Sequence, residues 1–177
     1  VRIMTTLRRF ALDDLLTFNN VNLDGLTETY NIGFYLEYLS RWPEYFEAAI
    51  SSNKNTMMGY CMGKSEGSEE LWHGHVTAVT VAPEYRRQGL ARTLMASLES
   101  TSTYLYNANF VDLFVRSSNN RAIDMYTKFG YTVYRRVLGY YSGVAPEDGL
   151  DMRKALERDK EGKSVIPLEH PITPEEL

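Results

Sequence analysis

A short stretch between a β-branched run and an apolar helical pattern has the composition of an anion-binding turn. It reads VAPEYRRQGLAR and places Arg86, Arg87 and Gly89 within four residues of one another. A helix N-terminus carries unpaired backbone N–H groups and about half a positive charge, so it attracts phosphate. A glycine lets the chain turn so that several N–H groups point at one ligand. The stretch therefore predicts a binding site for a pyrophosphate.

The two commonest phosphate-loop patterns do not account for this turn. GxxxxGK[ST] is absent from the chain, and GxGxxG does not follow the first predicted strand. What remains is Arg86-x-x-Gly89-x-Ala91 after a Val-Ala-Pro corner. An ordinary strand-to-helix turn with solvated arginines has the same residues, so the turn alone leaves both interpretations open.

Two motifs in sequence order resemble one enzyme superfamily. VTAVTVAPEYRRQGLARTLM resembles the acetyl-CoA loop of the GNAT acetyltransferases, R/Q-x-x-G-x-G/A after a V-x-P-x-x-R corner. Further along, NNRAIDMYTKFGY resembles their N-x-x-A-x-x-x-Y-x-x-x-G-F/Y helix, with Asn119 and Tyr126 in register. The resemblance implies an α/β protein with the GNAT fold, a central mixed, mostly antiparallel sheet flanked by helices. It also implies acetyl-CoA as co-substrate.

The resemblance assigns one set of residues to acetyl-CoA. Backbone groups of two of them, Val79 and Val81, are expected to pair with the pantetheine arm, and Tyr126 to protonate the leaving thiolate. The family accepts glycine or alanine at the last loop position, so Ala91 implies no loss of function. The set is Val79, Val81, Arg86, Arg87, Gln88, Gly89, Leu90, Ala91, Asn119 and Tyr126.

Longer segments resemble a narrower group. TTLR.F..DDL..FNN.NLD.LTETY, WPEYF, WHGHVTA, VDLFVR.SN and MRKAL resemble the catalytic subunits of the NatB class of N-terminal acetyltransferases. The resemblance implies acetylation of nascent polypeptides that begin Met-Asp, Met-Glu, Met-Asn or Met-Gln. It further implies a heterodimer with a large helical-repeat auxiliary subunit that docks on ribosomes, and a cytoplasmic location.

The acceptor that the resemblance implies is an α-amino group, which does not need a strong general base. An α-amine has a pKa near 7.7 to 8.0 against about 10.4 for lysine, so roughly a fifth is neutral near pH 7.2. A weak or water-relayed base is therefore sufficient. The candidate catalytic residues are Tyr126, His75, Glu28 and Tyr140.

The peptide groove of the superfamily is walled by the first helix-linking loop and a late strand hairpin. By resemblance, we expect residues from these segments and from the strand before Arg86 to face the substrate. His75, Thr77 and Tyr30 would meet the acidic or amide second residue, and Phe34 would seat the methionine. The full set is Glu28, Tyr30, Phe34, His75, Thr77, Tyr140 and Tyr141.

Several of these residues also have a purely structural interpretation. Tyr126 lies at helical spacing from Ala122 and fits a core position, and Glu28 fits a cap on the following helix. Tyr140 and Tyr141 are adjacent, so on a regular strand they point to opposite faces and at most one reaches the reaction centre.

A metal site is not expected. His73 and His75 share one strand face, but only His170 remains as a further histidine and there is no cysteine cluster.

The hydrophobic pattern predicts the elements that position these residues. The expected order is strand, two helices, three strands, helix, strand, helix, then one or two strands. In the second helix, Ile32, Tyr35, Leu36 and Leu39 form the apolar stripe, and the helix stops near Pro43. Phe34, Tyr38 and Trp42 are candidates for an exposed surface that contacts a partner, although a core-facing pattern is similar.

The bulk composition limits the function classes. The chain has 177 residues, 44% hydrophobic content and a net charge of −4, which argue for one globular domain and against a nucleic-acid binder. No apolar run suits a membrane span, and the single cysteine, Cys61, fits a reducing compartment and a core position.

The expected organisation is a cloning remnant at residues 1–3, an acetyltransferase domain at 4–156 and a C-terminal arm at 157–177. Rival functions are a GNAT enzyme acting on lysine or a small amine, and a non-catalytic acyl-CoA-binding subunit.

Overall fold

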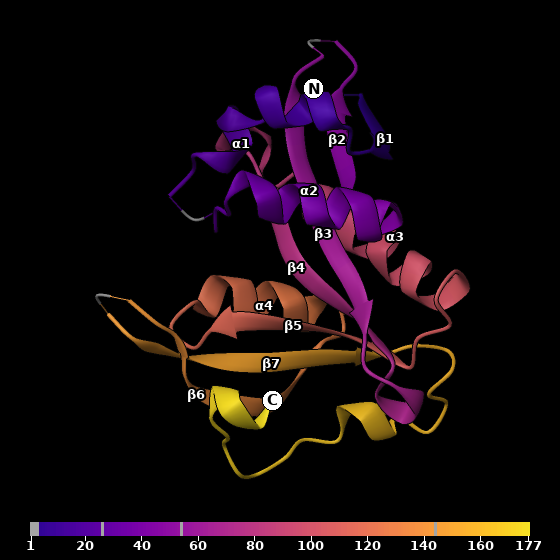
Figure 1. Ribbon diagram of the computed structural model, residues 1–177, viewed down its shortest axis with the longest axis vertical. Coiled ribbons are helices and arrows are strands. Elements are labelled where there is room, and N and C mark those ends of the chain that lie inside the picture. The colour runs from indigo at the N-terminus through magenta and orange to yellow at the C-terminus, as the bar shows by residue number, and fades with distance from the viewer. Residues whose placement is uncertain (1–3, 26, 54, 144) are drawn as a thin grey trace. The chain divides into compact units, whose positions relative to one another are not determined.

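The computed structural model describes residues 4–25, 27–53, 55–143 and 145–177 (Figure 1). The expected cloning remnant at residues 1–3 lies outside these ranges. The chain divides into two compact units, one of Val1–Ser65 and Val76–Thr101 and one of Glu66–His75 and Ser102–Leu177. Strand β4 (His73–Val81) contributes to both. The strands follow the order β1-β2-β3-β4-β5-β7-β6 in a seven-stranded sheet.

The first unit contains the N-terminal strands and helices. Strand β2 pairs antiparallel with β1 and with β3, so the first three strands are neighbours in the sheet. Helix α2 crosses in front of β2 and β3 (Figure 1). The elements are β1 (Thr5–Arg9), η1 (Leu12–Leu16), α1 (Asn19–Asn22), α2 (Ile32–Arg41), η2 (Pro43–Tyr45), β2 (Glu47–Ser51), β3 (Met57–Glu66), η4 (Pro83–Tyr85) and α3 (Leu90–Tyr104).

The core of this unit is rich in aromatic rings with satisfied hydroxyl groups. Phe10 stacks on Phe46 at 4.1 Å between ring centroids. The hydroxyls of Tyr35 and Tyr60 both donate to Asn22 Oδ1, at 3.1 and 2.9 Å. Because each buried phenol has a partner, the rings add apolar burial without leaving a polar group unpaired.

The lone cysteine is also part of this core. Cys61 is 1% exposed, and burial raises the pKa of its thiol to about 12. A thiol that stays protonated is a poor nucleophile, which agrees with the predicted core role.

Helix α2 forms where predicted but turns a different face to the core. Asn31 caps it by accepting the N–H of Phe34 at 3.0 Å. Tyr35 and Tyr38 are buried, whereas Ile32 is 60% exposed and Leu36 42% exposed. The predicted stripe is therefore wrong at Ile32 and Leu36, because the tyrosine rings bury more area than the aliphatic side chains they displace.

The predicted exposed aromatic surface on α2 is also wrong. Tyr38 is 4% exposed, and Phe34 and Trp42 are partly buried against the same core. The exposed apolar residues of this region are instead leucines and one isoleucine, Leu12, Leu16, Leu23, Ile32 and Leu36.

One glycine in β3 marks a close approach of two backbones. A Cβ at Gly59 would lie 2.5 Å from the carbonyl oxygen of Thr80 in β4. We expect Gly59→Ala to lower the free energy of unfolding by about 1–3 kcal/mol, because backbone atoms must move to admit the methyl group. Urea unfolding measures this, with Gly25→Ala as the matched control because its Cβ meets nothing within 4 Å. Equal stability of the two variants would contradict the close approach.

The second unit holds the C-terminal strands. Strand β7 pairs antiparallel with β5 and with β6. Helix α4 is capped by Asn119 and followed by Gly130 at φ 96°, a left-handed conformation that is common for glycine just after a helix. The elements are η3 (Glu69–Leu71), β5 (Phe110–Arg116), α4 (Asn120–Lys128), β6 (Thr132–Tyr141), β7 (Glu147–Ala155), η5 (Lys163–Val165) and η6 (Pro174–Glu176).

The C-terminal segment runs along β6. The N–H of Leu168 donates to Tyr134 O at 2.7 Å, and Leu138 N–H donates to Ile172 O at 2.8 Å. A parallel bridge joins Val137 to Ile172. The segment thus covers part of the free edge of β6, which would otherwise present unpaired backbone groups.

Candidate active site

The predicted anion-binding turn has the backbone geometry that an anion requires. It connects the end of β4 to α3, with Arg87 at φ 60° and Gly89 at φ 85°. Within the described residues, the N–H groups of Arg87, Gln88 and Gly89 have no acceptor. Successive N–H groups in such a turn form a concave anion site, and the N-terminus of α3 adds partial positive charge. The turn therefore fits a pyrophosphate.

The two arginines of the turn have different environments. The guanidinium of Arg86 donates through Nε to the carbonyl of Val81 at 2.9 Å and forms an ion pair with Asp24. Arg86 thus braces the turn, and part of its charge is balanced within the protein. The Arg87 side chain is exposed and has no ion pair within the described residues. Direct contact of Arg86 with phosphate stays a prediction. Of the two arginines, Arg87 is the one whose charge is not balanced by an ion pair within the described residues.

The residues on either side of the turn are firmly held. Val81 and Leu90 are buried, and Val79 and Ala91 pack against the core of the first unit. The rigid strand and helix therefore fix the turn between them. Pairing of Val79 and Val81 with a pantetheine arm stays a prediction.

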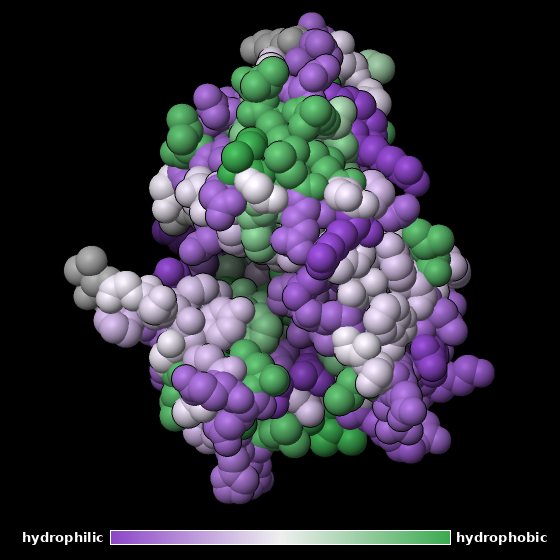
Figure 2. Space-filling model, in the orientation of Figure 1, coloured by the Kyte–Doolittle hydropathy of each residue, from purple (hydrophilic) through white to green (hydrophobic). Residues whose placement is uncertain are grey.

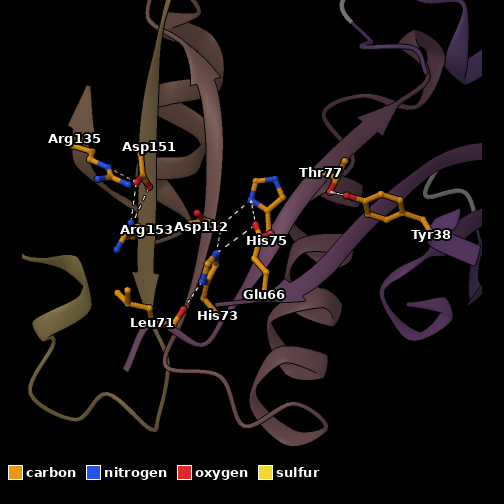
Figure 3. A network of polar contacts seen from close by, with 10 residues as sticks. All are labelled: Tyr38, Glu66, Leu71, His73, His75, Thr77, Asp112, Arg135, Asp151 and Arg153. Carbon is orange, nitrogen blue, oxygen red and sulfur yellow. Dashed lines mark hydrogen bonds and ion pairs between the residues drawn. The ribbon is translucent and has the colours of Figure 1, made fainter. Parts of the chain in front are cut away.

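Three of the predicted substrate residues lie together in the first unit. Tyr30 stacks on Phe34 at 4.5 Å, and its hydroxyl donates to the carbonyl of Thr77 at 3.2 Å. The Thr77 hydroxyl donates to the Tyr38 hydroxyl at 2.9 Å (Figure 3). These contacts hold the helix-linking loop and α2 against β4 at Thr77.

Glu28 stands apart from this group. It is exposed and makes no hydrogen bond or ion pair with any residue in the described ranges. It does not cap α2, because Asn31 does. The structural interpretation of Glu28 is therefore wrong, and its predicted role in positioning or proton handling stays a prediction.

His75 belongs to a polar cluster in the second unit (Figure 3). Its Nδ1 lies 2.8 Å from Oδ1 of Asp112, a buried carboxylate on β5, and 4.0 Å from Glu66 Oε1. His73 Nε2 lies 3.6 Å from the same Asp112 oxygen. The predicted shared face of the two histidines is confirmed.

The cluster also sets the charge of its members. Burial raises the pKa of Asp112, but its contacts with His75, His73 and Arg153 outweigh this and lower the pKa overall. Burial lowers the pKa of His73, but Glu66, Asp112 and the Leu71 carbonyl outweigh it and raise the pKa. Asp112 is therefore an ionised carboxylate at neutral pH.

The two late tyrosines do not point to opposite faces. Their rings meet edge to face at 5.0 Å, and Tyr140 also stacks on Phe114 at 4.4 Å. The prediction from regular alternation is wrong because the β6–β7 register shifts between Val137 and Tyr141, with Gly139 at φ 63°. Such a bulge redirects side chains.

Tyr126 and Asn119 lie on and before α4. Tyr126 is half-buried, and burial raises the pKa of its phenol to about 12. Its hydroxyl has no hydrogen-bond partner in the described part of the chain. Asn119 Oδ1 accepts the N–H of Ala122 at 3.2 Å, so this side chain caps the helix and leaves its amide nitrogen unpaired among the described residues.

Sequence reasoning missed Asp112 and Tyr38. Asp112 is the one acidic residue in the otherwise apolar strand FVDLFV, and that isolation could have singled it out as a buried partner for a polar group. Tyr38 was assigned to an exposed surface, and no sequence signal links it to Thr77.

No group of three or more histidine, cysteine or acidic residues in the described ranges could hold a metal ion. Among the same residues, no helix is both long and apolar enough to cross a membrane.

Comparison with known proteins agrees with the chemistry of the turn. Residues 12–131 match the model of the acetyltransferase (GNAT) family. The chain therefore belongs to the GNAT family, as its two motifs predicted.

Relatives of high identity define a narrower group. The chain is 65% identical over 174 residues to the N-terminal acetyltransferase B complex catalytic subunit NAA20 of Arabidopsis thaliana, covering 98% of both chains. It is 56% identical to the corresponding naa20 subunit of Schizosaccharomyces pombe, covering 92% of this chain and 91% of that one. The crystal structure of Chaetomium thermophilum Naa20 with a bisubstrate analogue matches with a TM-score of 0.88 and 42% identity, over 96% of this chain and 97% of that one.

Proposed function

We propose that this protein is the catalytic subunit of a NatB-type N-terminal acetyltransferase. It moves acetyl from acetyl-CoA to the α-amino group of proteins that begin Met-Asp, Met-Glu, Met-Asn or Met-Gln, by direct attack in a ternary complex. The observation that carries the proposal is the row of unpaired N–H groups from Arg87 to Gly89 ahead of α3. Near-full-length identity to named NatB catalytic subunits supports the choice of acceptor.

The chain supplies a binding site for the co-substrate. The N–H groups of Arg87, Gln88 and Gly89 bind the pyrophosphate, and Arg87 adds a cation beside them. Val79 and Val81 hold the pantetheine arm through their backbones, and the free amide nitrogen of Asn119 is a further donor. Leu90 and Ala91 begin the helix whose dipole favours the phosphates.

The chain also moves the protons of the reaction. The amine nitrogen forms a bond to the thioester carbon while the C–S bond breaks, the amine loses one proton and the thiolate gains one. Tyr126 donates to the thiolate, because its raised pKa keeps the phenol protonated. Glu28, His75 and Tyr140 are the candidates that accept the amine proton directly or through water.

Each of the two units has side chains that we assign to the peptide. Tyr30 and Phe34 form an aromatic surface for the methionine, with Thr77 beside it. His75 meets the second residue, and Tyr140 and Tyr141 contribute phenols from the strand pair β6–β7. We accordingly assign the acetyltransferase domain to residues 4–156. The C-terminal arm, residues 157–177, takes no part in the chemistry.

The acceptor class is tested by thiol release. The protein is incubated with acetyl-CoA and with peptides that begin MDEL or SESS or carry only an internal lysine. We expect release with the MDEL peptide to exceed the other two. Preference for the lysine peptide would favour the rival GNAT activity, and no release with any peptide would favour a non-catalytic acyl-CoA-binding subunit.

An exposed apolar surface suits the auxiliary subunit. One relative is described as the catalytic subunit of a complex, and one solved structure is described as the NatB acetyltransferase complex bound to a bisubstrate inhibitor. Leu12, Leu16, Leu23, Ile32 and Leu36 are between 42% and 80% exposed, and apolar surface gathers over η1 and the α1–α2 segment (Figure 2). We assign this surface to a helical-repeat auxiliary subunit that brings the enzyme to ribosomes in the cytoplasm.

A charge placed on this surface should weaken the complex. Leu36→Glu is expected to raise the Kd for the auxiliary subunit about ten- to a hundredfold, because a carboxylate would be desolvated in an apolar contact. Calorimetric titration measures the change. Leu138→Glu on β6 is the matched control, since both leucines are 42% exposed. Equal effects of the two substitutions would refute the assignment.

A further inference from the structure

The contact between His75 and Asp112 fixes which ring nitrogen is available to a ligand. His75 Nδ1 lies 2.8 Å from Asp112 Oδ1, and the carboxylate is 4% exposed. A carboxylate only accepts hydrogen bonds, so Nδ1 must carry the proton. Nε2 has no partner in the described ranges. Nε2 is therefore the nitrogen that remains for substrate.

The carboxylate of Asp112 is available to His75 because the nearby arginine, Arg153, is already paired with Asp151. Arg153 faces Asp112 across the β5–β7 register. Its guanidinium donates instead to both oxygens of Asp151, at 3.1 and 3.0 Å, and Arg135 adds a third contact at 3.2 Å (Figure 3). Asp112 therefore accepts its hydrogen bond from His75 on β4 and not from Arg153 on β7.

With Nδ1 held in this way, one imidazole can bind two kinds of side chain. The neutral ring offers the Nε2 lone pair, which accepts an amide N–H. The protonated ring offers Nε2–H, which donates to a carboxylate or to an amide oxygen. A carboxylate behind the ring stabilises the protonated form.

We propose that Asp112 is a positioning residue that presents Nε2 of His75 to the second substrate residue and lets the same site accept acidic and amide side chains. The inference rests on the proposed function, because it takes His75 as the residue that meets this position. Substrates that begin Met-Asp or Met-Glu need the imidazolium, whereas Met-Asn and Met-Gln substrates are bound by either form. The charge of Asp112 therefore matters most for the acidic class.

Three other charged or titratable groups lie around the His75–Asp112 pair. Glu66 on β3 lies 4.0 Å from His75 Nδ1 and places a second carboxylate beside the ring. His73 on β4 lies near both Asp112 and Glu66, and its raised pKa means that it opposes a second charge at mildly acidic pH. Arg153 on β7 acts on Asp112, whose pKa it helps to lower.

The decisive comparison uses Asp112→Asn, which keeps the shape and removes the charge. Specificity constants are measured with MDEL and MNEL peptides for the protein together with its auxiliary subunit. We expect the ratio of kcat/KM for MDEL over MNEL to fall about tenfold, because a charge-assisted hydrogen bond to the acidic side chain is roughly twice as strong as a neutral one. The KM for acetyl-CoA should change little. An unchanged ratio, with both peptides weakened alike, would mean that Asp112 is only structural.

A measurement on the unaltered protein guards against a variant that fails to fold. Nitrogen-15 NMR of the histidine side chains reports which ring nitrogen of His75 carries the proton. We expect the proton on Nδ1, because this nitrogen lies 2.8 Å from the Asp112 carboxylate, which can only accept a hydrogen bond. A neutral ring with its proton on Nε2 would overturn the inference. A protein with no preference for either peptide over SESS would instead overturn the proposed function, so the two failures are distinguishable.

Discussion

Gly89→Ala is expected to raise the KM for acetyl-CoA about ten- to a hundredfold. At φ 85°, Gly89 has a conformation that costs an L-residue about 1–2 kcal/mol. The cheapest relief is to rotate the turn, which would misdirect the N–H groups of Arg87, Gln88 and Gly89. Each hydrogen bond to a charged phosphate contributes about 1.5–3 kcal/mol, so losing even one gives an effect of this size.

The loss should fall on co-substrate binding more than on folding. A Cβ at Gly89 meets nothing within 4 Å, so no contact in the protein is broken. Gly162→Ala is the matched control: Gly162 has φ 65° and its Cβ would make only an ordinary contact, 3.8 Å from Val165. Steady-state kinetics and isothermal titration with CoA compare the two. Unchanged CoA affinity in Gly89→Ala would show that the turn does not bind the pyrophosphate.

Tyr126→Phe is expected to lower kcat about 10²-fold, with little change in either KM. General acid catalysis contributes about 10²–10⁴-fold, and a thiol with a pKa near 8.5 is a good leaving group, so the lower end applies. Because the pKa of Tyr126 is about 12, its phenol stays protonated through the assay range. The unaltered protein should therefore show no loss of kcat from this group below pH 10.

Tyr104→Phe controls for the loss of a hydroxyl as such, since Tyr104 is 75% exposed on α3. Single-turnover thiol release separates chemistry from product release. If Tyr126→Phe unfolds at a lower temperature but keeps its kcat, Tyr126 is an ordinary packing residue, as its helical spacing also allowed. If both tyrosine variants lose activity equally, the effect is not specific to Tyr126.

The helix-linking loop shows what pattern reasoning could and could not reach. The family resemblance predicted that Tyr30, Phe34 and Thr77 serve one groove. In the structure Tyr30 stacks on Phe34, and its hydroxyl donates to the backbone carbonyl of Thr77. The role of Tyr38 could not be predicted. The 3.6-residue period shows that a helix has an apolar face, but it does not show which of two neighbouring faces packs against the core. Tyr35 and Tyr38 are buried in the core because their rings bury more area, and Ile32 and Leu36 are exposed to solvent.

The late strand shows a second limit of the same kind. Alternation placed Tyr140 and Tyr141 on opposite faces, yet their rings are in contact. A register shift depends on pairing with a distant strand and on the positive φ of Gly139, neither of which local periodicity encodes.

By itself, the sequence determined the class of this protein and its co-substrate. Val81 to Arg92 and the α4 motif suffice because a phosphate turn is a local structure, specified by glycine, helix start and short-range spacing. Only the tertiary structure showed that Arg86 braces the turn through Asp24, and that Asp112 holds His75. The partners lie 62 residues apart in the first pair and 37 in the second, and they meet only in the folded chain, so no local pattern could have specified them.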